Sequence, residues 1–224
     1  MSDLDRGEVD RVRAVYDRYD NDPDVARRWD HANPGNRRIL AERRHVFADA
    51  LSGSQKIVEL GSGTGAVIAD LNDSTEGKSF VFGLDVVPER ARMASQAGAV
   101  TVVSDATCCA LQDRCVDVVV NCVAMSSIAP QLWPSVANEI HRILKPGGMV
   151  LWHDLRVPNP WNHHVKPLSR HTLATLFPNF TIVVRSATVL PQLSRRLPQI
   201  DRWYPALVRT RVFNTHLLGV LRAS

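Results

Sequence analysis

The sequence predicts an α/β fold: a seven-stranded, mostly parallel sheet with helices on both faces, preceded by a helical lid. Two observations predict the sheet. From residue 56 onward, short apolar runs alternate with stretches of helical periodicity, and a cluster of glycines follows the first run. Strands that alternate with helices form open, mainly parallel sheets. A third observation predicts the lid, because the first fifty residues carry helical patterns ahead of the first strand pattern.

The composition is that of a globular chain. The 224 residues are 45% hydrophobic and 22% charged, which excludes a disordered or fibrous protein. The longest apolar run, around residues 116–125, is shorter than the roughly 18 residues that span a membrane, and Asp117 and Asn121 interrupt it. The first residues are charged and lack the apolar core of a secretory leader, so we expect a cytoplasmic protein.

Two helices are expected before the sheet. The first covers residues 4–20. Its apolar side chains recur at helical spacing: Val9, Val12, Tyr16 and Tyr19. The second covers residues 37–51 and follows a turn-forming Asn-Pro-Gly-Asn sequence. We therefore expect residues 1–52 to form a lid and residues 53–224 to form the main domain.

The sheet follows from the remaining pattern. The expected strands lie at residues 56–60, 80–84, 99–103, 115–120, 149–152, 180–189 and 215–221. One expected helix follows the glycines and ends at residue 71. The others lie at residues 88–97, 131–144 and 168–176. Ligands of such sheets bind beyond the carboxyl ends of the strands. This rule indicates the residues at those ends: Gly61, Asp85, Asp105, Asn121 and Asp154.

The segment VELGSGTG, residues 58–65, is the strongest signal in the chain. Glycines at a strand-to-helix turn let the backbone bend sharply and let a ligand approach closely. Two interpretations compete. Gly61, Gly63 and Ala66 satisfy the G-x-G-x-x-A fingerprint of dinucleotide-binding proteins, with Asp85 at the distance of a ribose-binding acid. The other interpretation is a loop that binds S-adenosylmethionine.

Five segments in order favour the second interpretation. They are VELGSGTG, GLDVVPER, SDAT, CVDVVVNCVAM and LKPGGMVLWHDL. In order and spacing they resemble the class I S-adenosylmethionine-dependent methyltransferases over about residues 55–155. Three features distinguish this sequence from that of a dehydrogenase. They are the acidic Glu59 two positions before the first glycine, the compact GSGTG cluster, and the LKPGG turn before the fifth strand. The resemblance implies a Rossmann-like fold and S-adenosylmethionine as cofactor.

The resemblance also implies roles for single residues. Gly61, Ser62, Gly63 and Gly65 would lie against the methionine part of the cofactor, and Glu59 would help to hold that part. Asp85, followed by Val86, would accept hydrogen bonds from both ribose hydroxyls. The remaining cofactor residues would be Asp105 and Ala106 at the adenine edge, and Asn121 and Cys122 on the sulfonium side. Structural alternatives stay open: Gly65 and Asp85 as helix caps, and Asp105 and Asn121 as turn residues.

Methyl transfer to oxygen or nitrogen can require a base. The candidates are His153 and Asp154, which close the fifth strand, and a histidine titrates near neutrality. Similar methyltransferases commonly have tyrosine before this aspartate, so His153 is a departure from their pattern. The alternatives are a neutral, structural His153 and a capping Asp154.

Substrate residues are expected in the lid and in two loops. The candidates are Tyr16, Trp29, His31, Asn33, Met125 and His163. Burial of Tyr16 and Trp29 as anchors of the lid is the alternative. The segment at residues 151–180, with the later RTRVFNTHLLGVLR, is similar to bacterial methyltransferases from glycan and secondary-metabolite clusters. We therefore expect methylation of oxygen, nitrogen or activated carbon in a small molecule, a specialised metabolite.

The net charge of +4 by itself favours no partner class. In the C-terminal part of the chain, arginines are mixed with apolar residues. The arginines are Arg195, Arg196, Arg202, Arg209 and Arg211. Such a segment can contact a membrane surface or anionic ligands, but a solvated face is the commoner arrangement. It motivates an RNA-modifying methyltransferase as an alternative, although Asn121-Cys122-Val123-Ala124 replaces the DPPY/NPPY-type tetrad of nucleic-acid enzymes. An NAD(P)-dependent oxidoreductase and a non-catalytic cofactor-binding protein are further alternatives.

The remaining expectations concern metals and assembly. The four cysteines, Cys108, Cys109, Cys115 and Cys122, form no CxxC pair, so we expect reduced thiols. The pair His163-His164 has no carboxylate or histidine at metal-ligand spacing, so no metal is expected. We expect no DNA partner, and a monomer or homodimer.

Overall fold

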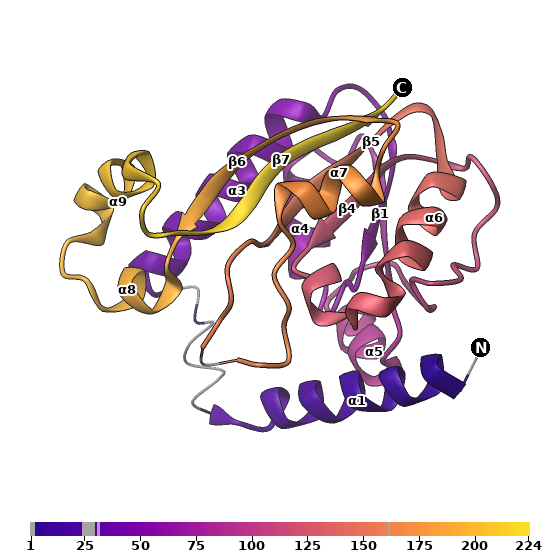
Figure 1. Cartoon of the computed structure of the whole chain (residues 1–224), viewed down its shortest axis with the longest axis horizontal. Helices are drawn as coiled ribbons and strands as arrows, with labels where there is room; N and C mark the ends of the chain where they lie inside the picture. The colour runs from indigo at the N-terminus through magenta and orange to yellow at the C-terminus, as the bar shows by residue number, and fades with distance from the viewer. Residues whose placement is uncertain (1–2, 24–29, 31, 161) are drawn as a thin grey trace.

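The computed structural model describes residues 3–23, 30, 32–160 and 162–224. The expected substrate residues Trp29 and His31 lie outside these ranges. Figure 1 shows a twisted sheet between two layers of helices, with one long helix running beneath it. No helix within the described ranges is long and apolar enough to cross a membrane.

The sheet has seven strands, as the sequence predicts. They are β1 (Lys56–Leu60), β2 (Phe80–Asp85), β3 (Thr101–Val103), β4 (Val116–Cys122), β5 (Leu144–Leu155), β6 (Phe180–Val189) and β7 (Asn214–Ala223). Their order is β3-β2-β1-β4-β5-β7-β6, and only β7 runs antiparallel to its neighbours. The chain reverses its direction of winding between β1 and β4, which is where ligands of open α/β sheets bind. The expected Rossmann-like, mostly parallel fold is confirmed.

Eight α-helices are described around this sheet. They are α1 (Asp3–Asp20), α3 (Pro34–Ala50), α4 (Ala66–Ser74), α5 (Pro88–Gln96), α6 (Trp133–Ile143), α7 (Arg170–Leu176), α8 (Pro191–Arg196) and α9 (Ile200–Thr210). Local signals explain several helix starts. The Asn33 side chain accepts hydrogen bonds from the Gly35 and Asn36 N–H groups, and prolines occupy the first turns of α3, α5 and α6.

The core consists of two apolar clusters, one on each face of the sheet. On one face, α6 and α7 pack against β4, β5 and β7, and Trp152 meets Phe177 at a ring-centroid distance of 6.1 Å. On the other face, α3 and α4 contribute Phe47, Ile68 and Leu71. Helix α3 is therefore part of the layered core, although the sequence places it in the lid region.

The structure corrects two details of the expected elements. Strand β5 begins at Leu144 rather than at residue 149, because the Lys-Pro-Gly-Gly segment bulges between two pairings with β4. Helices α8 and α9 were not expected. Helix α9 contains Pro205, which argues against a helix, and it is held by packing of Ile200 and Tyr204 against Val189.

Candidate cofactor site at the carboxyl edge of the sheet

The glycine loop between β1 and α4 begins the site. Gly61, Gly63 and Gly65 all have positive φ, at +64°, +53° and +85°, a region that side-chain-bearing residues rarely adopt. A Cβ on Gly61 would lie 3.1 Å from the Ala124 Cβ, so the loop passes close to the segment after β4. The Ser62 N–H donates to the Leu84 carbonyl at 3.0 Å, which ties the loop to the end of β2.

Asp85 ends β2 and joins two loops through its carboxylate. One oxygen accepts from the Gly63 N–H at 2.7 Å and the other from the Val87 N–H at 2.9 Å. The residue is buried. A carboxylate has about four acceptor positions, so holding these loops is compatible with accepting further hydrogen bonds from a ligand. The sequence interpretations of Asp85 as cap and as ligand acceptor therefore do not exclude each other.

Glu59 is a buried acid whose Oε2 has no hydrogen-bond partner within the described part of the chain. Burial raises the pKa of this carboxyl well above its usual value, and the nearby Arg43 opposes the shift. The Ser62 hydroxyl is likewise buried without a described partner. Unsatisfied buried polar groups are costly, and a ligand that supplies a partner removes the cost.

Arg43 of α3 is a site residue that the sequence analysis missed. Its guanidinium is buried and donates to Asp70 Oδ2 at 2.6 Å and to the Cys122 thiol at 3.3 Å. It thus connects α3, α4 and the end of β4 beside Glu59. No local motif marks this arginine, because its partners come from two distant parts of the chain.

The ends of β4 and β5 hold the next loop through two fully buried side chains. The Asn121 amide donates to Asp154 Oδ2 at 2.9 Å and accepts from the Met125 N–H at 3.0 Å. The Asp154 carboxylate also accepts from the Ser126 N–H at 3.1 Å and the Leu155 N–H at 2.7 Å. Burial raises the pKa of Asp154 and these hydrogen bonds oppose the shift. In the structure, both side chains position the loop that begins at Val123.

Val123 itself is strained. Its φ is +59°, an unusual value for a β-branched residue, and its N–H donates to the His153 carbonyl at 2.8 Å. Strained backbone of this kind clusters at functional sites. No pattern in the sequence predicts this conformation.

His153 lies on the opposite face of β5 from Asp154. Its Nε2 is 2.9 Å from the Thr188 hydroxyl, its Nδ1 is 3.7 Å from the Cys122 sulfur, and its ring stacks on His216 at 4.8 Å. Burial, with His216 and Arg43 nearby, lowers the pKa of His153 well below its usual value. Burial also lowers the pKa of His216 to about 4 and raises that of Cys122 to about 11. All three groups are therefore uncharged at neutral pH.

Comparisons with known proteins agree with this geometry. A family model described as a methyltransferase domain matches residues 57–148, which contain the glycine loop, Asp85, Asn121 and the Lys-Pro-Gly-Gly segment. This match spans about two fifths of the chain, and solved S-adenosylmethionine-dependent methyltransferases share the fold of the whole. None of the curated proteins matches the chain.

Solved structures share the fold of this chain at low sequence identity. A methyltransferase from Archaeoglobus fulgidus is 13% identical with a TM-score of 0.64, over 86% of this chain and 96% of that one. The geranyl diphosphate C-methyltransferase of Streptomyces coelicolor A3(2), crystallised with Mg²⁺, geranyl-S-thiolodiphosphate and S-adenosylhomocysteine, is 15% identical with a TM-score of 0.65, over 84% and 77%. A complex from Haloferax volcanii, between a methyltransferase activator and a candidate methyltransferase, contains a similar chain. The sequence identity is 20% and the TM-score is 0.60, over 87% of this chain and 95% of that one.

Solved methyltransferases that share this fold depend on S-adenosylmethionine, which supplies an electrophilic methyl group on sulfur. The residues present fit it. The orphaned Glu59 and Ser62 oxygens are buried acceptors next to the glycine loop, where an ammonium group finds partners. The left-handed glycines leave the loop backbone without side chains, so that a ligand can approach it.

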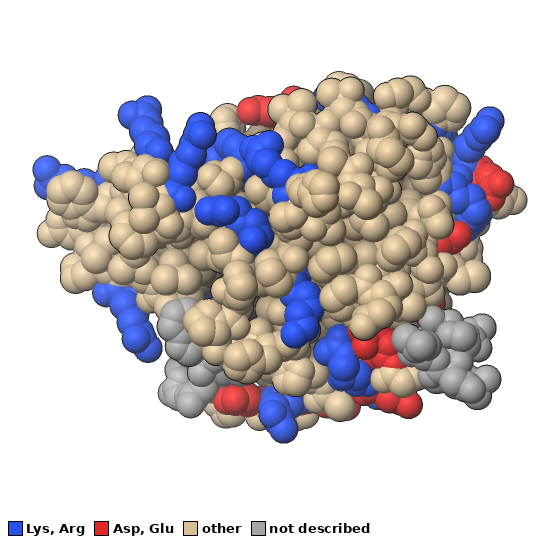
Figure 2. Space-filling model, viewed as in Figure 1, with Lys and Arg blue, Asp and Glu red and all other residues tan. Residues whose placement is uncertain are grey.

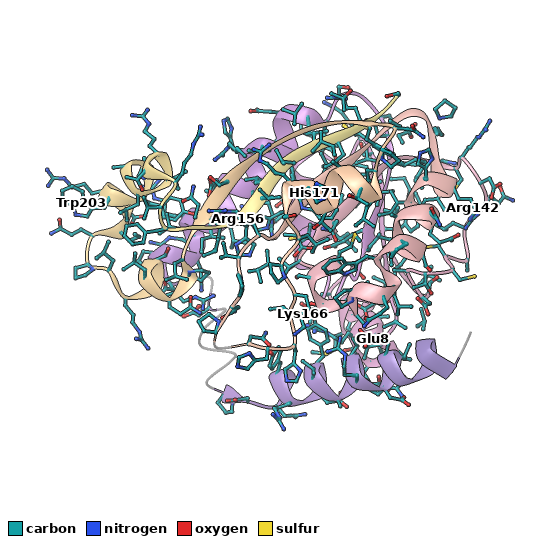
Figure 3. All side chains as sticks on the ribbon, in the orientation of Figure 1. Glu8, Arg142, Arg156, Lys166, His171 and Trp203 are labelled. Carbon is teal, nitrogen blue, oxygen red and sulfur yellow. The ribbon has the colours of Figure 1, made fainter. Side chains whose placement is uncertain are left out.

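Helix α1 covers this edge of the sheet. The Tyr16 hydroxyl lies 3.2 Å from the Ser127 hydroxyl, and the Arg90 guanidinium carbon lies 4.2 Å above the Tyr16 ring. Glu8 points from α1 toward the loops after β4 (Figure 3), where it accepts from the Ala129 N–H at 2.7 Å. A narrow cavity of about 20 Å³, roughly the space that one water molecule needs, lies between α1 and these loops. Its lining includes Arg11, Tyr16, Tyr19, Ser127, Asn162 and His164.

The structure brings other predicted residues only partly to this site. Tyr16 lines the pocket, whereas His163 is exposed and its neighbour His164 takes the lining position. Met125 is fully buried in the core. Asn33 caps α3, and its amide donates to the Arg195 carbonyl at 3.3 Å, so it serves the contact between α3 and α8.

Asp105 and Ala106, expected at the adenine edge, follow β3. The Asp105 Oδ1 accepts from both the N–H and the hydroxyl of Thr107 at 2.8 Å, which makes it a turn residue in this structure. The Ser104 N–H donates to the Asp85 carbonyl at 3.0 Å, so this turn lies next to Asp85. Ala106 packs against the apolar core. Their contact with adenine stays a prediction.

Proposed function

We propose that this methyltransferase transfers a methyl group to oxygen, nitrogen or activated carbon of a small molecule, a specialised metabolite. The observation that carries the proposal is that α1 covers the carboxyl edge of the sheet through Tyr16 and Glu8, beside the residues that fit the cofactor. A covered edge suits a small acceptor better than a long polymer, because a polymer would require a larger displacement of α1. The similar C-methyltransferase of Streptomyces coelicolor was crystallised with a small acceptor, geranyl diphosphate.

The proposal assigns the cofactor to the edge formed by β1, β2 and β4. Glu59, Gly61, Ser62, Gly63 and Gly65 would hold the methionine part. Asp85 and Val86 would bind the ribose, Asp105 and Ala106 the adenine, and Asn121 and Cys122 the sulfonium side. Support comes from the fixed Asp85 carboxylate and the unpartnered Glu59 oxygen. Of residues 1–52, expected as a lid on the domain formed by residues 53–224, α1 would act as the lid, whereas α3 packs in the core.

The lid is tested with two variants of Tyr16. Tyr16→Phe removes the hydroxyl near Ser127 and keeps the ring under Arg90, whereas Tyr16→Ala removes both contacts. We expect Tyr16→Ala to raise the KM for the acceptor more than Tyr16→Phe, with the affinity for S-adenosylhomocysteine changed less. Methyl transfer from tritiated S-adenosylmethionine to a small-molecule cell extract supplies the assay. Labelling of RNA, with none of the small-molecule pool, would contradict the proposal.

The catalytic base is the finer part of the proposal. His153 stands neutral at the end of β5, but burial lowers its pKa and so disfavours the protonated ring, and Thr188 and Cys122 already contact both ring nitrogens. Asp154 is likewise engaged with Asn121, Ser126 and Leu155. For either residue to act as base, a contact must open when the acceptor binds.

The variants His153→Gln and Asp154→Asn separate a base from a structural residue. A base is worth roughly 10²–10⁴-fold in turnover, and its loss abolishes the acidic limb of the pH–kcat profile. Loss of a residue that is only structural lowers the free energy of unfolding and leaves the shape of the pH–kcat profile unchanged. Equal kcat in the variant and the wild type, across the pH range, would remove that residue from the proposed mechanism.

RNA modification is the second candidate function, and one observation favours it. Lys and Arg side chains gather over β6, β7 and the α8–α9 segment, and acidic side chains lie at the top edge beside them, toward the other end and at the base of the molecule (Figure 2). Binding of RNA through such a face would weaken steeply with salt, whereas binding of a neutral small acceptor would not. Fluorescence anisotropy with labelled RNA between low and physiological salt measures this directly.

A further inference from the structure

A second concave region lies away from the glycine loop, where β6 and β7 meet α7 and the segment after β5. Its cavity volume is about 470 Å³, and it is open to solvent. We call it the arginine pocket after its polar lining, which includes Arg156, Arg170, His171, Arg185, Ser186 and Arg211. Figure 3 shows Arg156 beside β7 and His171 on α7.

The arginine pocket concentrates positive charge without acidic compensation. No Asp or Glu lines it among the residues that the structure describes. Arg185 is ion-paired, with its Nη1 2.9 Å from Glu42 Oε1. The charges of Arg156, Arg170 and Arg211 have no carboxylate partner in the described ranges: Arg156 Nε donates to the Asn214 carbonyl at 3.1 Å, and Arg170 donates to the Val184 carbonyl. Like charges held together in this way repel one another, and a bound anion relieves the repulsion.

The backbone presents two of these arginines from ordered positions. Arg156 directly follows β5, its N–H donates to the Thr215 carbonyl at 2.9 Å, and its side chain is half-buried. Arg211 ends α9 in a left-handed conformation with φ +61°. A guanidinium has five N–H donors in a planar fork that matches the oxygens of a phosphate, and the Arg156 bond to Asn214 uses one of them.

The position of the arginine pocket links it to methyl transfer. Arg156 follows the carboxyl end of β5, and in the sheet Leu60 pairs with Asn121, which pairs with Trp152. Arg156 is therefore four residues and two strands from the start of the glycine loop. At about 3.3 Å per residue and 4.8 Å per strand, this corresponds to roughly 16 Å between Cα atoms. A small molecule of moderate length can span that distance.

We propose that the arginine pocket binds a phosphate or diphosphate group, and that this group is the anionic end of the methyl acceptor. The second part rests on the proposed function. The concave shape suits a compact anion, and apart from the His171 imidazole no aromatic ring in its described lining is available to stack on nucleobases, as single-stranded nucleic-acid sites require.

Isothermal titration with inorganic pyrophosphate, at constant ionic strength, tests the pocket independently of turnover. We expect Arg156→Gln to weaken pyrophosphate binding at least tenfold and to leave the affinity for S-adenosylhomocysteine unchanged. The matched control is Arg209→Gln, which removes the same charge from an exposed position of α9 outside the pocket lining. Equal weakening by both variants, or no binding of pyrophosphate to the wild type, would overturn the assignment.

The source of the phosphate group is tested with the same proteins. Tritium transfer from S-adenosylmethionine to a small-molecule extract should disappear after phosphatase treatment of the extract and should be inhibited by pyrophosphate. Labelling that survives phosphatase would overturn the acceptor assignment. So would sedimentation with phosphatidylglycerol vesicles, or RNA binding, that depends on Arg156 and not on Arg209. An extract that yields no labelled product counts against the proposed function, while the titration still decides the pocket.

Discussion

Replacement of Glu59 by glutamine should make the free enzyme more stable and the cofactor complex weaker. The carboxyl is buried, its Oε2 has no partner in the described part of the chain, and burial raises its pKa well above the usual value. A folded-state pKa above the unfolded value means that the free energy of unfolding falls as pH rises through this interval. A neutral amide of the same shape does not titrate, so Glu59→Gln removes this pH-dependent loss.

The size of both effects follows from the burial of one group. An unsatisfied buried polar group costs roughly 1–3 kcal/mol, and a charged group costs more than an amide. We therefore expect the free energy of unfolding of Glu59→Gln to exceed that of the wild type by about 1–2 kcal/mol at pH 8. A hydrogen bond between the cofactor ammonium and a carboxylate is worth about 1.5–3 kcal/mol, so the affinity for S-adenosylmethionine should fall roughly ten- to hundredfold.

Two measurements on the wild type and the Glu59→Gln variant test these expectations. Urea unfolding of the free enzyme at pH 5 and pH 8 gives the stability difference, which should be larger at pH 8. Calorimetric titration with S-adenosylhomocysteine gives the affinity. Asp70→Asn is not a suitable control because Asp70 binds Arg43, whereas Glu76→Gln changes an exposed acid at the end of α4. A Glu59→Gln protein that is less stable than the wild type and binds the cofactor equally well would refute the reasoning.

Three further outcomes are expected. Asp85→Ala removes the acceptor of the Gly63 and Val87 N–H groups and should weaken S-adenosylhomocysteine binding by roughly 1–3 kcal/mol in calorimetric titration; an unchanged affinity would contradict the ribose assignment. His216 has its pKa lowered to about 4, so the unfolded chain takes up a proton first as pH falls from 6.5. The free energy of unfolding should drop by roughly 3 kcal/mol by pH 4, and His216→Gln should flatten this dependence in urea titrations. Phe177→Ala empties a fully buried position against Trp152 and should cost about 3–5 kcal/mol of stability, measured by urea unfolding, without changing cofactor affinity.

Local patterns were sufficient for the sheet and the glycine loop. The strands at residues 56–60 and 180–189 have the same bounds in the sequence prediction and in the structure, because alternating and continuous apolar runs report burial directly. The left-handed glycines were also predictable, since the GSGTG cluster follows a strand and precedes a helix. Helices α8 and α9 were not predictable from the sequence. Pro205 interrupts the helical pattern of α9, and the stability of α9 comes from its contact with Val189.

The sequence by itself determined the order of the strands along the chain, the glycine loop and the resemblance to methyltransferases, because these depend on residues that are neighbours in the chain. Only the tertiary structure decided which polar groups meet. Arg43 reaches Asp70 and Cys122, His153 meets Thr188 and His216, and Arg156 shares a pocket with Arg211. These partners are separated by tens of residues, and their burial and pKa shifts arise from the packing of α3 and the β6–β7 segment against the sheet, which no local pattern encodes.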